Sequence, residues 1–213
     1  MKMVPKKILV LSPHTDDGEL GCGGTIHKLI QQGHEIFWVA FSICRQSVPS
    51  QYPSDILATE VKSAIRILGV KQNNLIIFDY DVRTFGYRRQ DILEDLIRIR
   101  GDLQPDLVFL PGSEDIHQDH QTISQEGLRA FKASSILAYE LPWNNTSFRN
   151  SSFVKLSQEN LRGKIDALAE YKSQSHRTYT NENFLMSLAT VRGTQIGQNL
   201  AEAFEVVRLI IDI

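Results

Sequence analysis

The chain has 213 residues, of which 42% are hydrophobic and 23% are charged, and its formal net charge at pH 7 is −2. These values are ordinary for a globular protein, and the length favours a single domain over residues 1–213. They exclude the strongly basic surface of a typical nucleic-acid-binding protein, and no apolar run approaches the roughly 20 residues of a transmembrane helix.

The N-terminal residues and the cysteines predict the cellular compartment. Basic residues precede the apolar run at 8–11, but this run is too short for a signal peptide and is followed by charged residues. The two cysteines, Cys22 and Cys44, form no CxxC motif and indicate no disulfide framework. We therefore expect a cytoplasmic protein without a nucleic-acid partner, and the sequence leaves a homo-oligomer open.

Short β-rich runs alternate with longer helical patterns over the first two thirds of the chain. This alternation predicts an α/β fold with a mostly parallel sheet and helices on both of its faces. Ser54 is a candidate N-cap for one helix, and Gly69 would end that helix. Strands are expected at residues 7–12, 34–42, 74–80, 105–111 and 135–142, and helices at residues 23–32, 54–69, 88–103 and 118–132.

The pattern changes after Trp143. A polar loop is expected at residues 144–152 and a helix at 156–175. Residues 201–213 favour a strand, with a helix as the alternative. We expect this C-terminal third to decorate the same domain.

Two dense polar clusters fall at the ends of predicted strands. They are PHTDDGE, at residues 13–19, and PGSEDIHQDH, at residues 111–120. In open α/β sheets the ligands bind beyond the carboxyl ends of the strands. His14 and Asp17 are three residues apart, so a turn can bring both to one point, and His117 and His120 have the same spacing.

The residue types in these clusters predict a metal site. Three nitrogen or oxygen ligands with one open position are typical of catalytic zinc. His14, Asp17 and His120 would supply the three ligands, and a water would take the open position. Bound zinc lowers the pKa of that water to about 7. Mixed nitrogen and carboxylate ligands would also accept Fe²⁺ or Co²⁺.

The residues beside these ligands are candidates for catalysis. Asp16 would be the general base, and His117 would stabilise an oxyanion or, when charged, protonate a leaving nitrogen. Asp119 could hydrogen-bond a histidine and fix its tautomer. Each residue also has a structural alternative, because acids serve as N-cap and turn residues and histidines occur at solvated helix ends. Their joint position at two strand ends favours the site.

The glycines at 21–24 suggest a dinucleotide-binding loop as a competing hypothesis. The third glycine of that fingerprint would fall at Ile26, and no acid ends the second predicted strand. Tight packing where the chain turns into its first helix explains these glycines better.

The same segments resemble a known family. SPHTDDGELGCGGT at residues 12–25 is similar to the (P/A)HPDDE-ELGCGGT signature of the LmbE-like, or PIG-L, zinc N-deacetylases, and HQDH at 117–120 matches their HxDH motif. The similarity continues through PDLVFLP, YKSQ and RGTQIGQNLAEAF, which extends it over nearly the whole chain. It implies a Rossmann-like fold and hydrolysis of an N-acetyl group, usually from an N-acetylglucosamine unit, with release of acetate.

The resemblance also implies roles for single residues. Asp81 aligns with an acid that contacts sugar hydroxyls. Trp143 could stack on a sugar or anchor its loop, and Lys172 and Gln174 could face the site, although helix-end packing is preferred for them. The implied ligands are His14, Asp17 and His120, the implied base is Asp16, and His117 is the acid or oxyanion residue with Asp119 as its partner.

The chain departs from the family pattern at three positions. Thr15 replaces the proline after the first histidine, and Gly18 replaces a glutamate. Leu57 stands where many members carry an arginine, so sugar or aglycone contacts would differ. Arg45 or Arg83, on predicted strand-end loops, could substitute for that arginine or remain solvated surface charges.

The sequence therefore favours a zinc-dependent deacetylase acting on an N-acetylated amino sugar or its conjugate. One alternative is a metal-dependent amidohydrolase acting on a non-sugar amide. Another is a metal-free sugar-binding module, which the intact set of candidate catalytic residues argues against.

Overall fold

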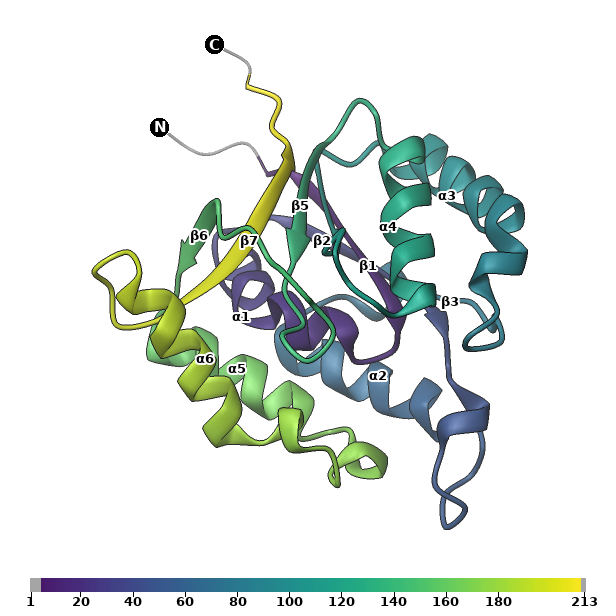
Figure 1. The fold of residues 1–213 in the computed structure, drawn as a ribbon, viewed down its shortest axis with the longest axis horizontal. Helices are drawn as coiled ribbons and strands as arrows, with labels where there is room; N and C mark the ends of the chain where they lie inside the picture. Colours follow the sequence, from purple (N-terminus) through teal and green to yellow (C-terminus); the bar gives the residue numbers. More distant parts are fainter. Residues whose placement is uncertain (1–4, 212–213) are drawn as a thin grey trace.

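The computed structural model describes residues 5–211, which contain a seven-stranded sheet of order β3-β2-β1-β4-β5-β7-β6 (Figure 1). The pairs among β1 to β5 are parallel, and β7 runs antiparallel to both β5 and β6. This confirms the expected mostly parallel sheet. The strands are β1 (Lys7–His14), β2 (Glu35–Ser42), β3 (Leu75–Ile77), β4 (Leu107–Pro111), β5 (Ser135–Tyr139), β6 (Ser152–Lys155) and β7 (Ala201–Arg208).

Helices cover both faces of the sheet. One face carries α3 and α4, which pack against each other, and the other carries α1, α2 and α5 (Figure 1). None of the helices in the described part of the chain combines the length and the apolar character that crossing a bilayer requires. The helices are α1 (Asp17–Gln31), α2 (Ile56–Leu68), α3 (Arg89–Leu103), α4 (Gln118–Ala130), α5 (Gln158–Leu168) and α6 (Glu182–Thr194).

Strand β1 is apolar on both faces because it lies inside the sheet. Its side chains alternate between two hydrophobic cores: Ile8 and Val10 pack in one, and Leu9 and Leu11 in the other. All four are buried, as expected for a strand with helices on both sides. This packing on both sides holds the strand in place, and with it His14, its last residue.

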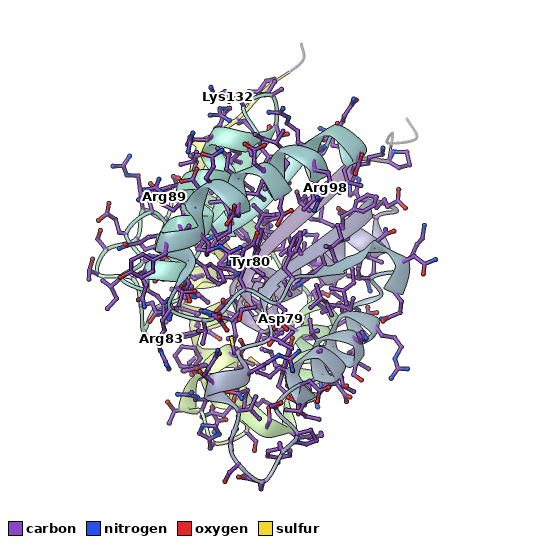
Figure 2. The ribbon with its side chains drawn as sticks, turned by 90° about the vertical axis from the view of Figure 1, so that its right-hand side faces the viewer. Asp79, Tyr80, Arg83, Arg89, Arg98 and Lys132 are labelled. Carbon is purple, nitrogen blue, oxygen red and sulfur yellow. The ribbon has the colours of Figure 1, made fainter. Side chains whose placement is uncertain are left out.

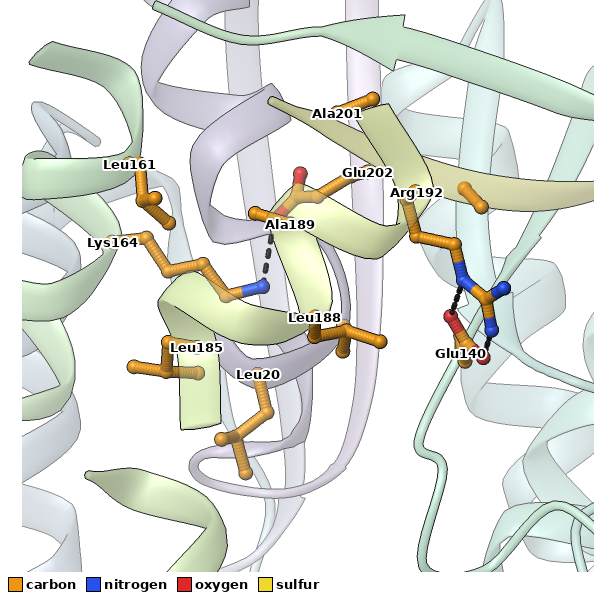
Figure 3. Close-up of a pocket in the computed structure, with 12 residues that line it drawn as sticks. Leu20, Glu140, Leu161, Lys164, Leu185, Leu188, Ala189, Arg192, Ala201 and Glu202 are labelled. Carbon is orange, nitrogen blue, oxygen red and sulfur yellow. Dashed lines mark hydrogen bonds and ion pairs between the residues drawn. The ribbon is translucent and has the colours of Figure 1, made fainter. Parts of the chain in front are cut away.

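Helix α1 differs from the prediction because it begins at Asp17 rather than at residue 23. It has a kink at Cys22, and the backbone N–H groups of Gly24 and Thr25 that follow donate to the Glu202 carboxylate at 3.1 and 2.7 Å. The Lys164 ammonium lies 2.7 Å from the same carboxylate (Figure 3). A side chain far away in the sequence thus satisfies the donors that the kink exposes.

The glycines of this segment allow close packing, as predicted. A Cβ atom at Gly21 would overlap the ring of Tyr139, and one at Gly18 would overlap the indole of Trp38. Trp38 therefore occupies the space that a side chain at position 18 would need. This explains why the chain has a glycine where the family signature has a glutamate.

Other element boundaries also differ from the predictions. The chain leaves the sheet after Ile77, earlier than the strand expected at 74–80, and passes through Asp79, Tyr80 and Arg83 below α3 and α4 (Figure 2). Helix α2 begins after Asp55 rather than Ser54, but it ends at Gly69 in the left-handed conformation, as predicted.

The C-terminal third is built into the sheet. Strand β7 confirms the strand expected from residue 201, and β6 begins at the end of the segment expected as a polar loop. Helix α5 ends at Leu168, earlier than expected, and α6 was not predicted. Arg192 of α6 forms a partly buried ion pair with Glu140 after β5 (Figure 3).

Candidate metal and active site

The two polar clusters meet at the carboxyl ends of β1 and β4, which are neighbours in the sheet. Three atoms face one another there. His14 Nδ1 lies 3.1 Å from Asp17 Oδ2, His120 Nε2 lies 3.2 Å from the same oxygen, and the two ring nitrogens are 3.1 Å apart. The fold thus brings together the three predicted ligands, two from the first polar cluster and one from the second.

Buried carboxylates fix the tautomers of both histidines. His14 donates from Nε2 to Asp119 Oδ2 at 3.1 Å, and His120 donates from Nδ1 to Asp115 Oδ2 at 2.7 Å. In these tautomers the other two ring nitrogens, which face Asp17, carry lone pairs. Three acceptor atoms then face one another, which is unfavourable unless a positive charge lies between them.

The geometry of this triangle fits a single divalent cation. Ligands bound tetrahedrally at 2.0–2.1 Å lie about 3.3 Å from one another. The observed separations of 3.1–3.2 Å are close to that value. A ring nitrogen of His117 also lies within 4.8 Å of the nitrogens of His14 and His120, but this looser group lacks the ligand spacing of the triangle.

The charges of the site support the same interpretation. Burial raises the pKa of the Asp17 carboxyl, but the charges of His120 and His14 and their hydrogen bonds outweigh it and hold the pKa well below its usual range. Burial lowers the pKa of His120, whereas Asp17 and Asp115 raise it to about 10. The pKa of His14 is also raised, because Asp17 and Asp119 outweigh its burial. The site strongly favours a positive charge at its centre.

Asp16 lines the pocket beside this triangle. It occupies the N-cap position of α1, yet within residues 5–211 its side chain makes no capping hydrogen bond. Burial and the neighbouring Asp17 raise the pKa of Asp16 to about 6. Its carboxylate is therefore not used to begin the helix, in contrast to the structural alternative considered for it.

His117 is the N-cap of α4, and this fixes its tautomer. Its Nδ1 accepts the backbone N–H of Asp119 at 3.2 Å, so the ring proton lies on Nε2. Burial and the charges of His14 and His120 lower the pKa of His117 to about 4. The ring is therefore neutral near pH 7 and can donate a hydrogen bond, rather than act as the charged acid that the sequence also allowed.

Asp119 has a different partner from the one that the family resemblance implied. Its Oδ2 is 4.0 Å from His117 Nδ1 but 3.1 Å from His14 Nε2. The same oxygen accepts the backbone N–H of Arg83 at 2.6 Å. Asp119 therefore links a ligand of the triangle to the loop between β3 and α3.

A cavity of about 280 Å³ lies over these groups. Trp143 lines it, and one face of its indole stacks on Tyr179, with ring centroids 4.1 Å apart and planes 9° apart. The stack joins the loop after β5 to the segment between α5 and α6. The lining residues are His14, Thr15, Asp16, Asp17, Cys44, Ser47, Leu57, Val82, Arg83, His117, His120, Trp143, Asn144, Gln174, Arg177 and Tyr179.

Asp81, which was expected to contact the sugar, and Arg45, one of two candidates to replace the missing arginine, lie outside this lining. Asp81 is exposed and accepts a hydrogen bond from Gln46 Nε2 at 2.7 Å, while Val82 and Arg83 form the wall. Contact between Asp81 and a substrate therefore stays a prediction. Arg45 is likewise exposed and paired with Asp79 at 2.8 Å.

The YKSQ segment, residues 171–174, contacts residues that flank the site. The Tyr171 hydroxyl donates to the carbonyl oxygen of Thr15 at 2.7 Å and lies 2.9 Å from Glu19 Oε1. Ser173 donates from its backbone N–H and its hydroxyl to Glu60. Gln174 lines the cavity, whereas Lys172 is exposed and bonds a backbone carbonyl.

Sequence reasoning missed Asp115, Tyr171 and Tyr179. Asp115 stood in a cluster already noted, but it lies five residues before His120, a spacing that matches no regular element. Tyr171 was quoted only as part of a motif. Tyr179 carried no signal, because its position depends on a loop that packs against Trp143.

The PIG-L family, described as GlcNAc-PI de-N-acetylase, matches residues 9–131. This chain belongs to the PIG-L family. The matched residues include both polar clusters and thus every member of the triangle, so family membership and geometry rest on the same residues.

Two relatives of this PIG-L protein carry the name deacetylase. The uncharacterized deacetylase YaiS of Escherichia coli K12 is 31% identical over 79% of this chain and 91% of its own. The diacetylchitobiose deacetylase of Thermococcus kodakarensis is 25% identical over 95% of this chain and 83% of its own. The structure of N,N′-diacetylchitobiose deacetylase from Pyrococcus horikoshii covers 95% of this chain and 84% of its own, with a TM-score of 0.78 and 24% identity, and shares the fold.

Proposed function

We propose that this chain is a zinc-dependent N-deacetylase that removes the acetyl group from an N-acetylglucosamine-type amino sugar or its conjugate and releases acetate. The observation that carries the proposal is the triangle of facing acceptor atoms from His14, Asp17 and His120 at the floor of a cavity that Asp16 also lines. Membership of a deacetylase family supports the reaction, and two imidazoles with a carboxylate support zinc.

Asp16 is suited to be the general base. Zinc, when bound, supplies a Lewis acid and an activated water near neutral pH. Asp16 faces the cavity with an uncommitted carboxylate, and its raised pKa brings it closer to the range in which a base transfers protons efficiently. The proton of the attacking water therefore moves to the Asp16 carboxylate.

His117 is suited to stabilise the tetrahedral intermediate. Its Nδ1 is held by the backbone of α4, and this leaves the Nε2–H as the donor of a ring that lines the cavity. A neutral donor placed before the reaction begins stabilises the negative charge that develops on the acetamide oxygen. Asp119 and Asp115 orient the histidines of the triangle and do not contact the reacting atoms.

The stacked Trp143 and Tyr179 rings are suited to bind the sugar. Together they form one aromatic wall of the cavity, and an aromatic face buries the apolar side of a ring while leaving polar groups to hydrogen-bond elsewhere. Because the stack already holds the Tyr179 ring in place, its side chain loses little conformational entropy when the sugar binds.

An acetate-release assay with zinc-loaded protein tests the proposal. N-acetylglucosamine, its methyl glycoside and diacetylchitobiose are compared with N-acetylated amino acids as non-sugar amides. We expect acetate from the amino sugars, and an Asp16→Asn variant that retains zinc serves as the control for contaminating activity. Acetate from the amino acids alone would contradict the substrate class, and equal activity without zinc would contradict the metal.

A further inference from the structure

We propose that Arg83 and Arg177 form an anion-binding subsite at the cavity, so that the preferred substrate is an amino sugar carrying a phosphate or carboxylate group. This inference rests on the proposed function and deepens it. The two arginines come from separate parts of the chain, the loop between β3 and α3 and the segment between α5 and α6, and both line the same cavity.

Neither guanidinium group forms an ion pair within the part of the chain that the structure describes. Among residues 5–211, no carboxylate lies within 4.0 Å of either one, whereas the neighbouring Arg45, Arg88 and Arg89 each pair with a carboxylate at 2.5 to 2.8 Å. Among the lining residues that the structure describes, Arg83 and Arg177 are the ones with a permanent positive charge. Two uncommitted guanidinium groups on one cavity are suited to bind an anion.

The backbone holds Arg83 beside the active site. Its N–H donates to Asp119 Oδ2 at 2.6 Å, and its φ of 70° places it in the left-handed region that non-glycine residues rarely adopt. Its Nη2 lies 3.5 Å from the hydroxyl of Ser47, another lining residue. Figure 2 shows Arg83 at the surface, apart from Arg89 and Arg98. The main chain is fixed, and the guanidinium group remains available.

Arg177 is held in a comparable way. Its backbone N–H donates to the carbonyl oxygen of Gln174 at 2.9 Å, and Gln174 is itself a buried lining residue. Two residues later, Tyr179 stacks on Trp143. These contacts anchor the backbone on both sides of Arg177 to the cavity wall, while the Arg177 side chain is exposed.

The position of the reacting group indicates which part of the substrate would meet the arginines. The acetamido group must reach His14, Asp17 and His120, so a substituent elsewhere on the sugar extends along the cavity wall. The floor carries the carboxylates of Asp16 and Asp17, which repel an anionic substrate. Two guanidinium groups offset this repulsion and bind phosphate or carboxylate oxygens in a bidentate manner.

Substrate comparison with the zinc-loaded protein tests the subsite. N-acetylglucosamine 1-phosphate and N-acetylmuramic acid provide the phosphate and the carboxylate, and methyl N-acetylglucosaminide is the neutral reference. We expect kcat/KM to be at least about tenfold higher for a charged sugar than for the neutral one, as one charge-assisted contact suggests. The better of the two charged sugars identifies the anion.

Variants then assign the effect to the two residues. Arg83→Gln and Arg177→Gln should each raise KM for the charged sugar about tenfold and leave kcat/KM for the neutral sugar within about twofold. Arg66→Gln is the matched control, since Arg66 is exposed on α2 and has no carboxylate within 4.0 Å among the residues that the structure describes. Equal losses on charged and neutral sugars, or no preference in the unaltered protein, would overturn the subsite.

A binding measurement separates this inference from the proposed function. If no amino sugar is deacetylated, the proposed function fails, and the subsite is judged by calorimetric binding of N-acetylglucosamine 1-phosphate to the zinc-loaded Asp16→Asn protein. Affinity that falls about tenfold in the two arginine variants and is unchanged in Arg66→Gln supports the subsite. Affinity that is the same in all variants overturns it.

Discussion

At the scale of single residues, the site depends on which nitrogen of each histidine carries a proton. Asp119 and Asp115 decide this for His14 and His120, because each accepts a ring N–H and turns the opposite nitrogen towards Asp17. Both carboxylates are buried, so water competes little for the hydrogen bond that each makes with its histidine. The two imidazoles are therefore oriented before the proposed zinc ion binds.

Asp115→Asn tests this orientation. The amide keeps the size of the side chain but removes its charge, and an outer partner of a metal-bound histidine typically contributes 10–100-fold in metal affinity. We expect zinc affinity to fall within about that range, with most of kcat retained at saturating zinc. Competition with a chromophoric chelator measures the affinity, and an unchanged value would remove Asp115 from the site.

The pH dependence of activity should distinguish Asp16 from His117. The pKa of Asp16 is raised to about 6 without an ion, and a bound cation lowers it, so kcat/KM should rise with pH through a value at or below about 6. His117, with a pKa lowered to about 4, stays neutral and contributes no alkaline limb. Asp16→Asn should cost roughly 10²–10⁴-fold in rate with zinc retained. Near-normal turnover of that variant would reassign Asp16 to a structural role.

At the scale of elements, the kink in α1 depends on a buried ion pair. Glu202 accepts the N–H groups of Gly24 and Thr25, and Lys164 neutralises its charge. The kink matters for function because the first part of α1 carries Asp16 and Asp17 at its start. Helices α1 and α5 and strand β7 are therefore coupled through one carboxylate.

Lys164→Met should destabilise the fold strongly. It leaves the buried Glu202 carboxylate without its counter-charge, a loss of about 3–5 kcal/mol in the free energy of unfolding. Lys71→Met is the matched control: Lys71 forms an exposed pair with Glu35, and its loss should be under about 1 kcal/mol. Urea denaturation compares the two variants. Adding Glu202→Gln to Lys164→Met should recover part of the loss, and no recovery would contradict the pairing.

The helices and strands also show what the sequence could predict. Strands with continuous apolar runs, such as Ile8 to Leu11, and helices with clear stops, such as Gly69, were predicted because their signals are local. The sequence prediction began this helix at residue 23 because it did not join the two parts of α1 across the kink at Cys22, where the exposed N–H groups are satisfied by Glu202, far away in the chain. The site triangle was predicted from motif spacing, whereas Asp115 and Tyr179 depend on loops whose conformation only the packed fold determines.

At the scale of the whole molecule, the fold gathers carboxylates around one point and needs a positive charge there. Asp17, Asp115 and Asp119 are buried together, and in the metal-free protein the protons on His14 and His120 supply that charge. An ion bound at the proposed site would supply it instead and would displace those protons, because the facing nitrogens would be its ligands. Metal binding, protonation and global stability are therefore linked.

This linkage predicts how stability changes with pH. The folded-state pKa of His120 is raised to about 10 and that of His14 is also raised, so their contribution is complete below the unfolded value of 6.5 and is lost as the pH rises. Each proton that the native state retains and the unfolded state has lost lowers the free energy of unfolding by up to about 1.4 kcal/mol per pH unit. The melting temperature of the metal-free protein should therefore fall from pH 6.5 to 8.5.

Zinc should remove this decrease, because its charge does not depend on protonation, and the gain in melting temperature on adding zinc should grow with pH over the same range. Thermal unfolding with and without zinc at several pH values measures the gain. His120→Ala is the control, since it lacks both the raised pKa and a ligand, and its melting temperature should respond little to zinc at any of these pH values. A gain that is constant with pH in the unaltered protein would mean that zinc displaces no protons, and that the ion binds elsewhere than between His14 and His120.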